Sequence, residues 1–278
     1  MKLCVKLTAA VVIFCSCERG VAQGSAKTEA AVGPDTKIAD VSENVVESAE
    51  NLRLREALKL ANIPEAMSSK IVAAGVSVFL PDLAKAMEGD PFLYRLVDKQ
   101  HALPEGYEPD DLVKLDNNGT YRVGRSDLRL RREAAEALEH MSKAARAEGI
   151  TLIASSAYRS FDYQKEVYQR NVRESGQETA DRESSRPGFS QHQLGLVIDF
   201  GSITDEFAKT PAGRWILKNG PAYGWSLSFP DGYEQLTGYR WESWHYRYTG
   251  AALAAFIDKW FNGIQQYALQ FIYAWENC

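Results

Sequence analysis

The chain has 278 residues, 45% of them hydrophobic, and a formal net charge of -5 at pH 7. This length and composition are enough for one hydrophobic core, or for one core with a small second cluster, in a globular protein. Acidic and basic residues are interspersed, and the sequence has no basic block of the kind that neutralises a phosphate backbone. The composition therefore argues against nucleic acid as a partner.

The first residues are typical of an export signal. Lys2 and Lys6 flank the start of an apolar run that is too short to span a bilayer. Because "FCSC" resembles a bacterial lipoprotein cleavage box, we expect residues 1–17 to be a signal peptide with Cys17 as the lipidated first residue of the mature protein. The alternative is an ordinary secretory signal cut near Ala22. Either signal predicts export to the bacterial cell envelope. Lipidation adds a periplasmic, lipid-anchored location in which only the anchor contacts a membrane.

The segment after the signal divides into a tether and a helical extension. Residues 18–50 are rich in Ala, Ser, Thr, Glu and Val without a steady period, which predicts a flexible tether. Over 51–90, apolar residues recur at helical spacing and are interrupted by Pro and Gly, which predicts two or three short helices. Residues 91–278 are assigned to the main domain. Beyond Cys17 the only cysteine is Cys278, so this domain has no internal disulfide.

The main domain mixes helices and strands. We expect helices over 128–149, 160–175, 211–220 and 250–274, and strands over 150–160, 196–200 and 238–248. Ser160 is the predicted N-cap of the second helix, and Thr210-Pro211 marks the start of the third. The order of the elements has no repeating βαβ rhythm, which favours an α+β fold with an antiparallel central sheet flanked by helices.

Two of the four histidines, His192 and His245, are candidates for a functional site. His140 falls on a predicted helix surface, and His101 precedes a proline loop, where a structural role is expected. His192 lies in a loop rich in Gly, Pro and Ser, and Asp199 follows it in an apolar strand. Burying an unpaired carboxylate costs several kcal/mol, so something must compensate Asp199.

A metal ion would compensate it. His192, Asp199 and His245 offer nitrogen, oxygen and nitrogen ligands, a set that suits a catalytic zinc with an open fourth position. Glu242 could then take a proton from the attacking water. Residues three apart in a regular strand face opposite sides, so this site requires a bulge or bend at residues 243–244. The alternative is that Glu242 and His245 are satisfied core residues of an aromatic strand.

The order of three motifs resembles a known family. "SAYRS" with Gln164 soon after, then "SQHQLGLVID", then "ESWH" occur in the order found in VanY-type zinc D-alanyl-D-alanine carboxypeptidases, members of the LAS peptidase group. The resemblance covers roughly residues 90–260. It implies the hedgehog/DD-peptidase fold and makes 91–278 a zinc peptidase domain.

The resemblance also implies a role for each matching residue. One zinc ion per chain is bound by His192, Asp199 and His245. Glu242 is the general base, and Arg159 polarises the scissile carbonyl and stabilises the oxyanion. Two residues, Ser190 and Gln164, line the substrate cleft and hydrogen-bond the peptide. The alternatives are a structural ion pair at a strand end for Arg159 and a loop cap for Ser190.

Several positions depart from the family pattern without removing a ligand or the base. The family often has Glu or Asp at Gln191, Thr at Leu194 and Ala at Val197, and Arg-Tyr-Pro where residues 228–230 are "SFP". These departures put in doubt which peptide fits, because the last of them is expected near the pocket wall.

The expected function is hydrolysis of the terminal D-alanine of peptidoglycan stem peptides. The alternatives are an L,D-carboxypeptidase, a peptidoglycan endopeptidase, and a non-catalytic cell-wall binding module. Serine or cysteine catalysis is disfavoured, because the sequence has no Gly-x-Ser-x-Gly elbow and Cys278 is the last residue of the sequence.

Overall fold

The computed structural model describes residues 48–278, which lie in one compact unit, Val46–Cys278. The predicted signal peptide, Cys17 and all but the last residues of the predicted tether lie outside the described residues. The first described helix begins at Ala49, where the Ser48 side chain accepts a hydrogen bond from the Asn51 amide. Helical structure therefore begins just inside the segment that was expected to be a tether.

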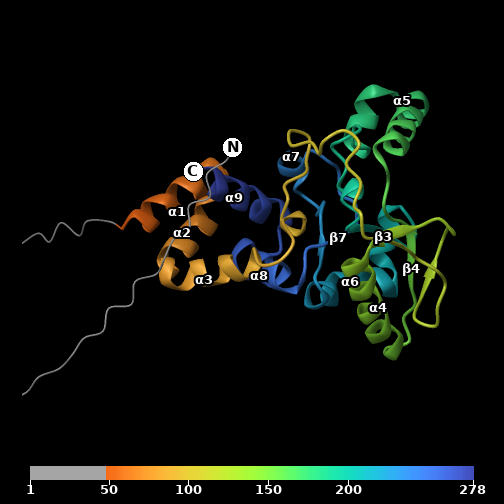
Figure 1. Ribbon diagram of the computed structural model, residues 1–278, viewed down its shortest axis with the longest axis horizontal. Helices are drawn as coiled ribbons and strands as arrows, with labels where there is room; N and C mark the ends of the chain where they lie inside the picture. Colours follow the sequence, from red (N-terminus) through yellow and green to blue (C-terminus); the bar gives the residue numbers. More distant parts are fainter. Residues whose placement is uncertain (1–47) are drawn as a thin grey trace, which may run out of the picture. The chain divides into compact units, whose positions relative to one another are not determined.

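The described chain is a mixed α+β fold, as predicted (Figure 1). Its helices are α1 (Ala49–Leu60), α2 (Glu65–Ala74), α3 (Val76–Ala86), α4 (Arg132–Ala147), α5 (Phe161–Glu183), α6 (Pro211–Asn219), α7 (Glu234–Thr237), α8 (Ala251–Phe261) and α9 (Gln265–Asn277). Its strands are β1 (Leu112–Lys114), β2 (Tyr121–Val123), β3 (Arg129–Arg131), β4 (Leu152–Ser156), β5 (Val197–Phe200), β6 (Trp225–Leu227) and β7 (His245–Tyr248).

The central sheet has five strands in the order β2-β4-β5-β7-β6, and β1 pairs with β3 in a separate small sheet. The pairs β4–β5, β5–β7 and β6–β7 are antiparallel, as expected. The pair β2–β4 at the edge of the sheet is parallel, so the predicted antiparallel sheet contains one parallel pair. A parallel neighbour requires a long crossover connection, and the chain supplies it through β3 and α4.

Helix α4 covers part of this sheet. Its buried residues Ala134, Leu138, Met141 and Ala145 recur every three or four positions, as one face of a helix requires. They belong to the same core as residues of β4 and β5. This core holds the strands that carry the site described below.

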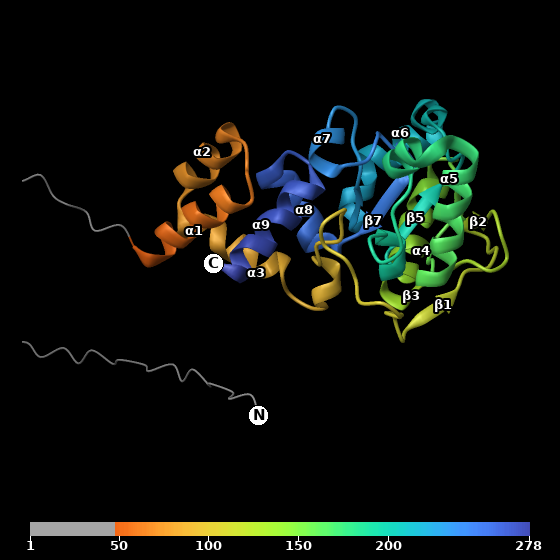
Figure 2. The same ribbon diagram turned by 90° about the horizontal axis from the view of Figure 1, so that it is seen from above.

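A second core is made only of helices and their connections. Helices α1, α2 and α3, the predicted short helices, pack with α8 and α9 (Figures 1 and 2). Phe79 lies fully buried at its centre, with ring centroids of Phe256, Trp260 and Phe271 at 5.4, 5.1 and 5.3 Å. The predicted domain boundary near residue 90 remains a prediction, but the first three helices share their core with the last two.

Arg247, which is buried in β7, hydrogen-bonds the segment that follows α3 and so connects that segment to the central sheet. Its Nη2 donates to the carbonyl oxygens of Phe92, Leu93 and Arg95 at 3.0, 3.1 and 2.8 Å. The side chain is completely buried, and burial lowers its pKa to about 9. The segment between the two cores is thereby held against the strand that carries His245.

Several predicted elements have different bounds in the structure. The helix expected over 160–175 extends to Glu183, and the strand expected over 150–160 is limited to Leu152–Ser156. The helix expected over 128–149 begins at Arg132, because residues 129–131 pair with β1. The helix expected over 250–274 is broken, because Asn262 and Gly263 have φ angles of 52° and 77° and separate α8 from α9. The strand expected over 238–248 exists only at 245–248.

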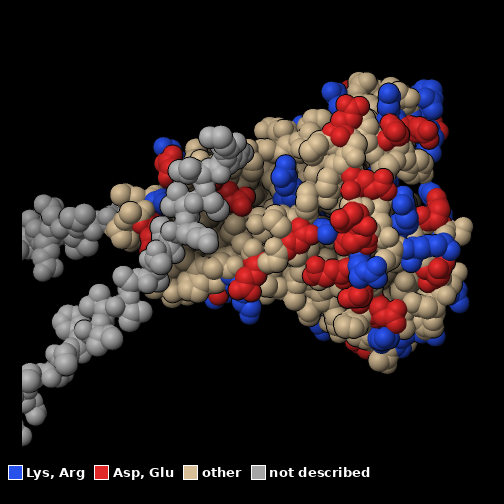
Figure 3. Space-filling view, in the orientation of Figure 1, with Lys and Arg blue, Asp and Glu red and all other residues tan. Residues whose placement is uncertain are grey.

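The surface shown in Figure 3 carries acidic and basic side chains side by side. Among the described helices, none is by itself long and apolar enough to cross a membrane. The pair α2 and α3 meets that test together by length and composition, with a bend of 107° between them.

One glycine is required where the loop that carries His192 enters β5. Gly195 ends the short 3-10 turn η2 (Gln191–Leu194) in the left-handed conformation, with φ 69° and ψ 18°. A Cβ atom at this position would lie 2.9 Å from Leu112 Cδ2 and 3.0 Å from Arg131 Cγ. Both the backbone and the surrounding space therefore favour glycine.

We expect Gly195→Ala to lower the free energy of unfolding by about 1–3 kcal/mol, the typical cost of such backbone strain. Urea denaturation of the full chain measures the change. Gly119→Ala is the control, because nothing lies within 4 Å of its Cβ position and its φ is not positive. Equal stability of the two variants would show that the turn accepts a side chain.

Candidate metal centre

The site is built on a row of residues that crosses three strands. Asp199 in β5 lies directly opposite Ser156 in β4 on one side and His245 in β7 on the other. Directly opposed residues of antiparallel strands project from the same face of a sheet. The register therefore brings Ser156, Asp199 and His245 together, although they are far apart in the sequence.

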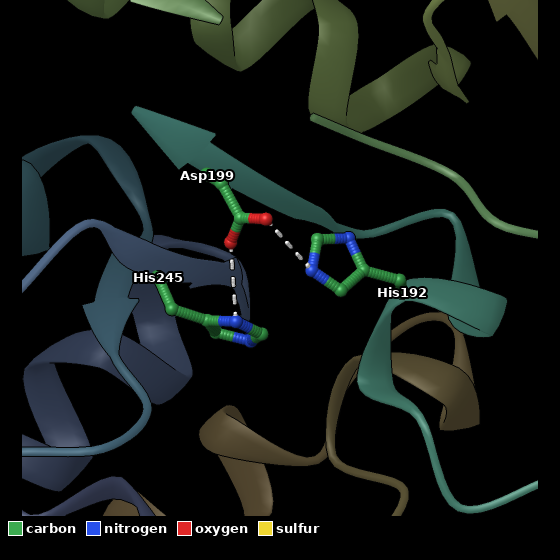
Figure 4. A group of neighbouring side chains, drawn as sticks. All are labelled: His192, Asp199 and His245. Atoms are coloured by element: carbon green, nitrogen blue, oxygen red, sulfur yellow. Dashed lines mark ion pairs between the residues drawn. The ribbon is translucent and has the colours of Figure 1, made fainter. Parts of the chain in front are cut away.

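His192 reaches this row from the turn η2. Its Nδ1 lies 2.7 Å from the carbonyl oxygen of Ala157, and its Nε2 lies 3.3 Å from Asp199 Oδ2 (Figure 4). Since a carbonyl can only accept a hydrogen bond, Nδ1 carries the proton. The Nε2 lone pair of the neutral ring then faces Asp199, as a metal ligand requires.

Glu242 and His245 face the same cavity because the backbone turns between them. The amide of His245 donates to the carbonyl of Glu242 at 3.2 Å, and residues 243–244 form a turn. Glu242 Oε2 lies 3.3 Å from His245 Nδ1. The predicted break in the strand at Ser243 and Trp244 is thus confirmed, and the regular alternation that would have separated the two side chains is absent.

The three expected ligand residues converge. One ligand atom from each of His192, Asp199 and His245 lies within 4.8 Å of the others, and all three residues are buried. Figure 4 shows both imidazole rings beside the carboxylate, with the Nδ1 of His245 at 3.3 Å from Asp199 Oδ1. Ligand atoms about 2.0–2.2 Å from a tetrahedral zinc are themselves about 3.3–3.6 Å apart. The two distances from a histidine nitrogen to an Asp199 oxygen, 3.3 Å each, lie within this range.

A second observation supports a cation at this position. Asp199 is only 2% exposed, and within residues 48–278 its Oδ1 has no hydrogen-bond partner. A buried carboxylate oxygen without a partner is costly. Together with the two imidazole nitrogens it makes a donor set that a metal ion would satisfy.

The charges around the site keep Asp199 ionised beside a neutral His192 ring and the cationic Arg159. Burial lowers the pKa of His192 to about 4, with a smaller contribution from the Arg159 guanidinium, so this ring is neutral. Burial alone would raise the pKa of Asp199, but His192, His245 and Arg159 outweigh it and hold that pKa well below its ordinary value. Burial raises the pKa of Glu242. Burial alone would lower the pKa of His245, but Asp199 and Glu242 raise it.

Arg159 is paired with the central carboxylate. Its Nη2 donates to Asp199 Oδ2 at 2.8 Å and to Ser156 Oγ at 2.8 Å, and its Nε donates to Ser156 Oγ at 3.1 Å. The ion pair considered as an alternative is therefore present. The partner of Arg159 in this ion pair is Asp199, a candidate ligand, and Arg159 also lines the cleft. Contact with a substrate carbonyl remains a prediction.

Gln164 and Ser190 have protein partners in the structure. Gln164 is 0% exposed, and its Nε2 donates to the carbonyl of Ser185 at 2.7 Å. Its Oε1 lies 3.4 Å from Arg159 Nη1, so it supports the arginine from behind. Ser190 caps η2 by accepting from the His192 amide at 3.3 Å, and it also lines the cleft. Direct contact of either side chain with a peptide remains a prediction.

The site opens into a cleft of about 250 Å³. The cleft contains the three candidate ligands, Glu242 and Arg159, and it has a partly apolar wall. That wall includes Val167, Ile203, Phe229, Tyr239 and Trp244. A peptide end could enter it with a small apolar side chain against this wall and its polar groups toward the centre.

Sequence reasoning missed two residues of the site. Ser156 is the first residue of the "SAYRS" motif but was given no role there; its hydroxyl accepts hydrogen bonds from the Arg159 guanidinium. Tyr239 lines the cleft and packs against Phe229 with ring centroids 4.8 Å apart. Burial raises its pKa to about 12. Nothing in the sequence alone marked it, because its place depends on how the turn after α7 folds.

Comparisons with known proteins agree with this geometry. Residues 127–251 match the family model VanY, described as D-alanyl-D-alanine carboxypeptidase. YodJ of Bacillus subtilis is 38% identical over 169 residues, which cover 59% of this chain and 62% of that protein. The chain spans 53–62% of the length of the first curated relatives it matches.

Two solved structures are similar in fold. The LdcB LD-carboxypeptidase is 35% identical, with a TM-score of 0.54 over 61% of this chain and 85% of that one. A mutant of the vancomycin resistance D,D-pentapeptidase VanY in complex with Zn(II) is 28% identical, with a TM-score of 0.52 over 62% of this chain and 96% of that one. The matched residues include every candidate ligand and the base, in the fold predicted from the motif order. Residues 127–251 therefore form a VanY family domain, similar in sequence and fold to these carboxypeptidases.

Proposed function

We propose that this protein is a zinc-dependent carboxypeptidase that removes the terminal D-alanine from peptidoglycan stem peptides. The observation that carries the proposal is the convergence of ligand atoms from His192, Asp199 and His245 within 4.8 Å, with the Glu242 carboxylate beside them. The family description and the Zn(II) complex of a similar structure support both the activity and the metal.

The residues of the chain have distinct parts in this reaction. Zinc, when bound by the three ligands, supplies a Lewis acid that polarises the scissile carbonyl and acidifies water. Glu242 accepts the proton of the attacking water on its carboxylate and passes it to the amine of the departing D-alanine as the peptide C–N bond breaks. Arg159 keeps Asp199 ionised and places a permanent positive charge beside the developing oxyanion.

We expect Glu242→Ala to bind one zinc ion per chain while its kcat falls by about 10²- to 10⁴-fold, the usual contribution of a general base. Metal analysis of the purified protein and release of D-alanine from a pentapeptide measure the two effects. Glu166→Ala is the control, because Glu166 is an exposed residue of α5. Full activity of the Glu242 variant, or wild-type protein that binds no zinc, would refute the mechanism.

The bond that is cut has a second candidate. The similarity to the LdcB LD-carboxypeptidase supports an L,D-carboxypeptidase that acts on tetrapeptides. An endopeptidase would use the same metal and base on a cross-linked peptide. The two structural relatives therefore support two candidate specificities for this cleft.

Mass spectrometry of the products from defined muropeptides distinguishes these activities. We expect a pentapeptide to lose one D-alanine, because the residues on both sides of its final bond carry small methyl side chains, which suit the partly apolar wall of the cleft. Loss of D-alanine only from a tetrapeptide would assign the L,D activity, and cleavage of a cross-linked dimer would assign an endopeptidase. Binding of muropeptides by zinc-loaded protein without any product would favour the non-catalytic module.

The location of the protein is also proposed, from the sequence of a segment outside the described residues. A lipid on Cys17 would hold the catalytic domain at the bacterial envelope, on a tether that begins after the anchor. We expect cells fed a labelled fatty acid to incorporate it into the wild-type protein and not into Cys17→Ser. A Cys278→Ser variant is the control and should keep the label. Equal labelling of the wild type and Cys17→Ser would favour an ordinary secretory signal.

A further inference from the structure

Gln191 is adjacent to a candidate ligand in the sequence but contacts a different one in space. It follows Ser190 in the turn that carries His192, and its side chain crosses to β7. There Gln191 Oε1 lies 3.3 Å from Nε2 of His245. The residue is 4% exposed, so water does not compete for this contact.

The contact selects the nitrogen of His245 that can bind a metal. Nδ1 of His245 is the nitrogen that faces Asp199 and Glu242. For Nδ1 to offer a lone pair, the proton of the neutral ring must be on Nε2 and must find an acceptor. Gln191 Oε1 is that acceptor. In His192 the roles of the two nitrogens are reversed. Nδ1 donates to the Ala157 carbonyl, and Nε2 faces Asp199.

Ser228 fixes which end of the Gln191 amide points at the ring. The Ser228 hydroxyl lies 2.8 Å from Gln191 Oε1 and donates to it. Ser228 is 2% exposed, and its backbone amide donates to the carbonyl of His245 at 3.2 Å. The buried Gln265, the first residue of α9, lies on the far side, with Oε1 at 3.3 Å from Ser228 Oγ. The hydroxyl has one proton, and the shorter contact directs it to Gln191, so Ser228 fixes the acceptor oxygen.

We propose that Gln191 is a positioning residue that holds His245 with its proton on Nε2 and its Nδ1 toward the metal, and that Ser228 orients Gln191 for this task. The inference rests on the metal centre proposed above. Groups that orient a ligating histidine typically change metal affinity about 10- to 100-fold when they are lost. A neutral amide here also adds no further negative charge to a pocket that already contains two carboxylates.

The first test compares two buried glutamines of the same turn. We expect Gln191→Met to weaken zinc binding by the full chain by about 10- to 100-fold in competition with a chelator of known affinity. Gln193→Met is the matched control. Gln193 is also fully buried, and its Nε2 donates to the carbonyl of Tyr107 at 3.0 Å, away from the ligands. Gln193→Met should keep the wild-type zinc affinity.

Rescue and a spectroscopic signature separate positioning from packing. Gln191→Glu retains an acceptor oxygen and should recover most of the affinity that Gln191→Met loses. Ser228→Ala leaves the Gln191 amide free to rotate. We expect its zinc affinity to lie between those of Gln191→Met and the wild type. In zinc-loaded protein with ¹⁵N-labelled histidine, we expect the proton of His245 on Nε2 in the wild type, and an altered Nε2 signal in Gln191→Met.

The outcomes are distinguishable. Wild-type affinity in Gln191→Met, or an equal loss in Gln191→Met and Gln193→Met, would overturn the positioning role while leaving the metal centre intact. A His245 proton on Nδ1 in the zinc-loaded wild type would also overturn it. Wild-type protein that binds no zinc would remove the metal centre itself, and the inference with it.

Discussion

The structure around the site depends on the burial of one carboxylate. Asp199 is almost inaccessible to water in the middle of the sheet, where a charge is stable only with close partners. Arg159 supplies a permanent cation at 2.8 Å, and two imidazoles approach the carboxylate from a turn and from the neighbouring strand. Each partner needs its own support, which Ser156, the Ala157 carbonyl and Gln191 provide. The charge balance of the cavity is thus distributed over three strands and one turn.

Much of the site could be predicted because its chemistry is visible in short stretches of sequence. Asp199 in an apolar strand signalled that a partner was required, and the order of the three motifs supplied His192, His245 and Glu242. The strand register then explains why these positions meet, since Asp199 and His245 are directly opposed in β5 and β7. The requirement for a turn at residues 243–244 followed from the period of a strand alone.

Other features could not be predicted because they depend on contacts between distant segments. The parallel pairing of β2 with β4 is decided by where α4 returns the chain, and the break between α8 and α9 by the left-handed Asn262. Gln164 resembled a residue that touches substrate, but its burial behind Arg159 is a property of the folded loop. In the sequence, Gln191 differed from the residues that the family often has at this position, and nothing else marked it. Its partner lies 54 positions further along the chain, and no local period connects the two.

The composition of the helical core has a consequence for how the chain folds. Its buried residues come from two stretches, 54–96 and 253–274, so the two sets must meet across most of the described sequence. Closing so long a loop costs conformational entropy before any contact repays it, which makes such a core slow to form. The central sheet and α4 use contacts that are closer in sequence and can form earlier. A chain that emerges from its amino end would keep the apolar faces of α1, α2 and α3 uncovered until its last two helices arrive, which is the interval in which a chaperone could bind them.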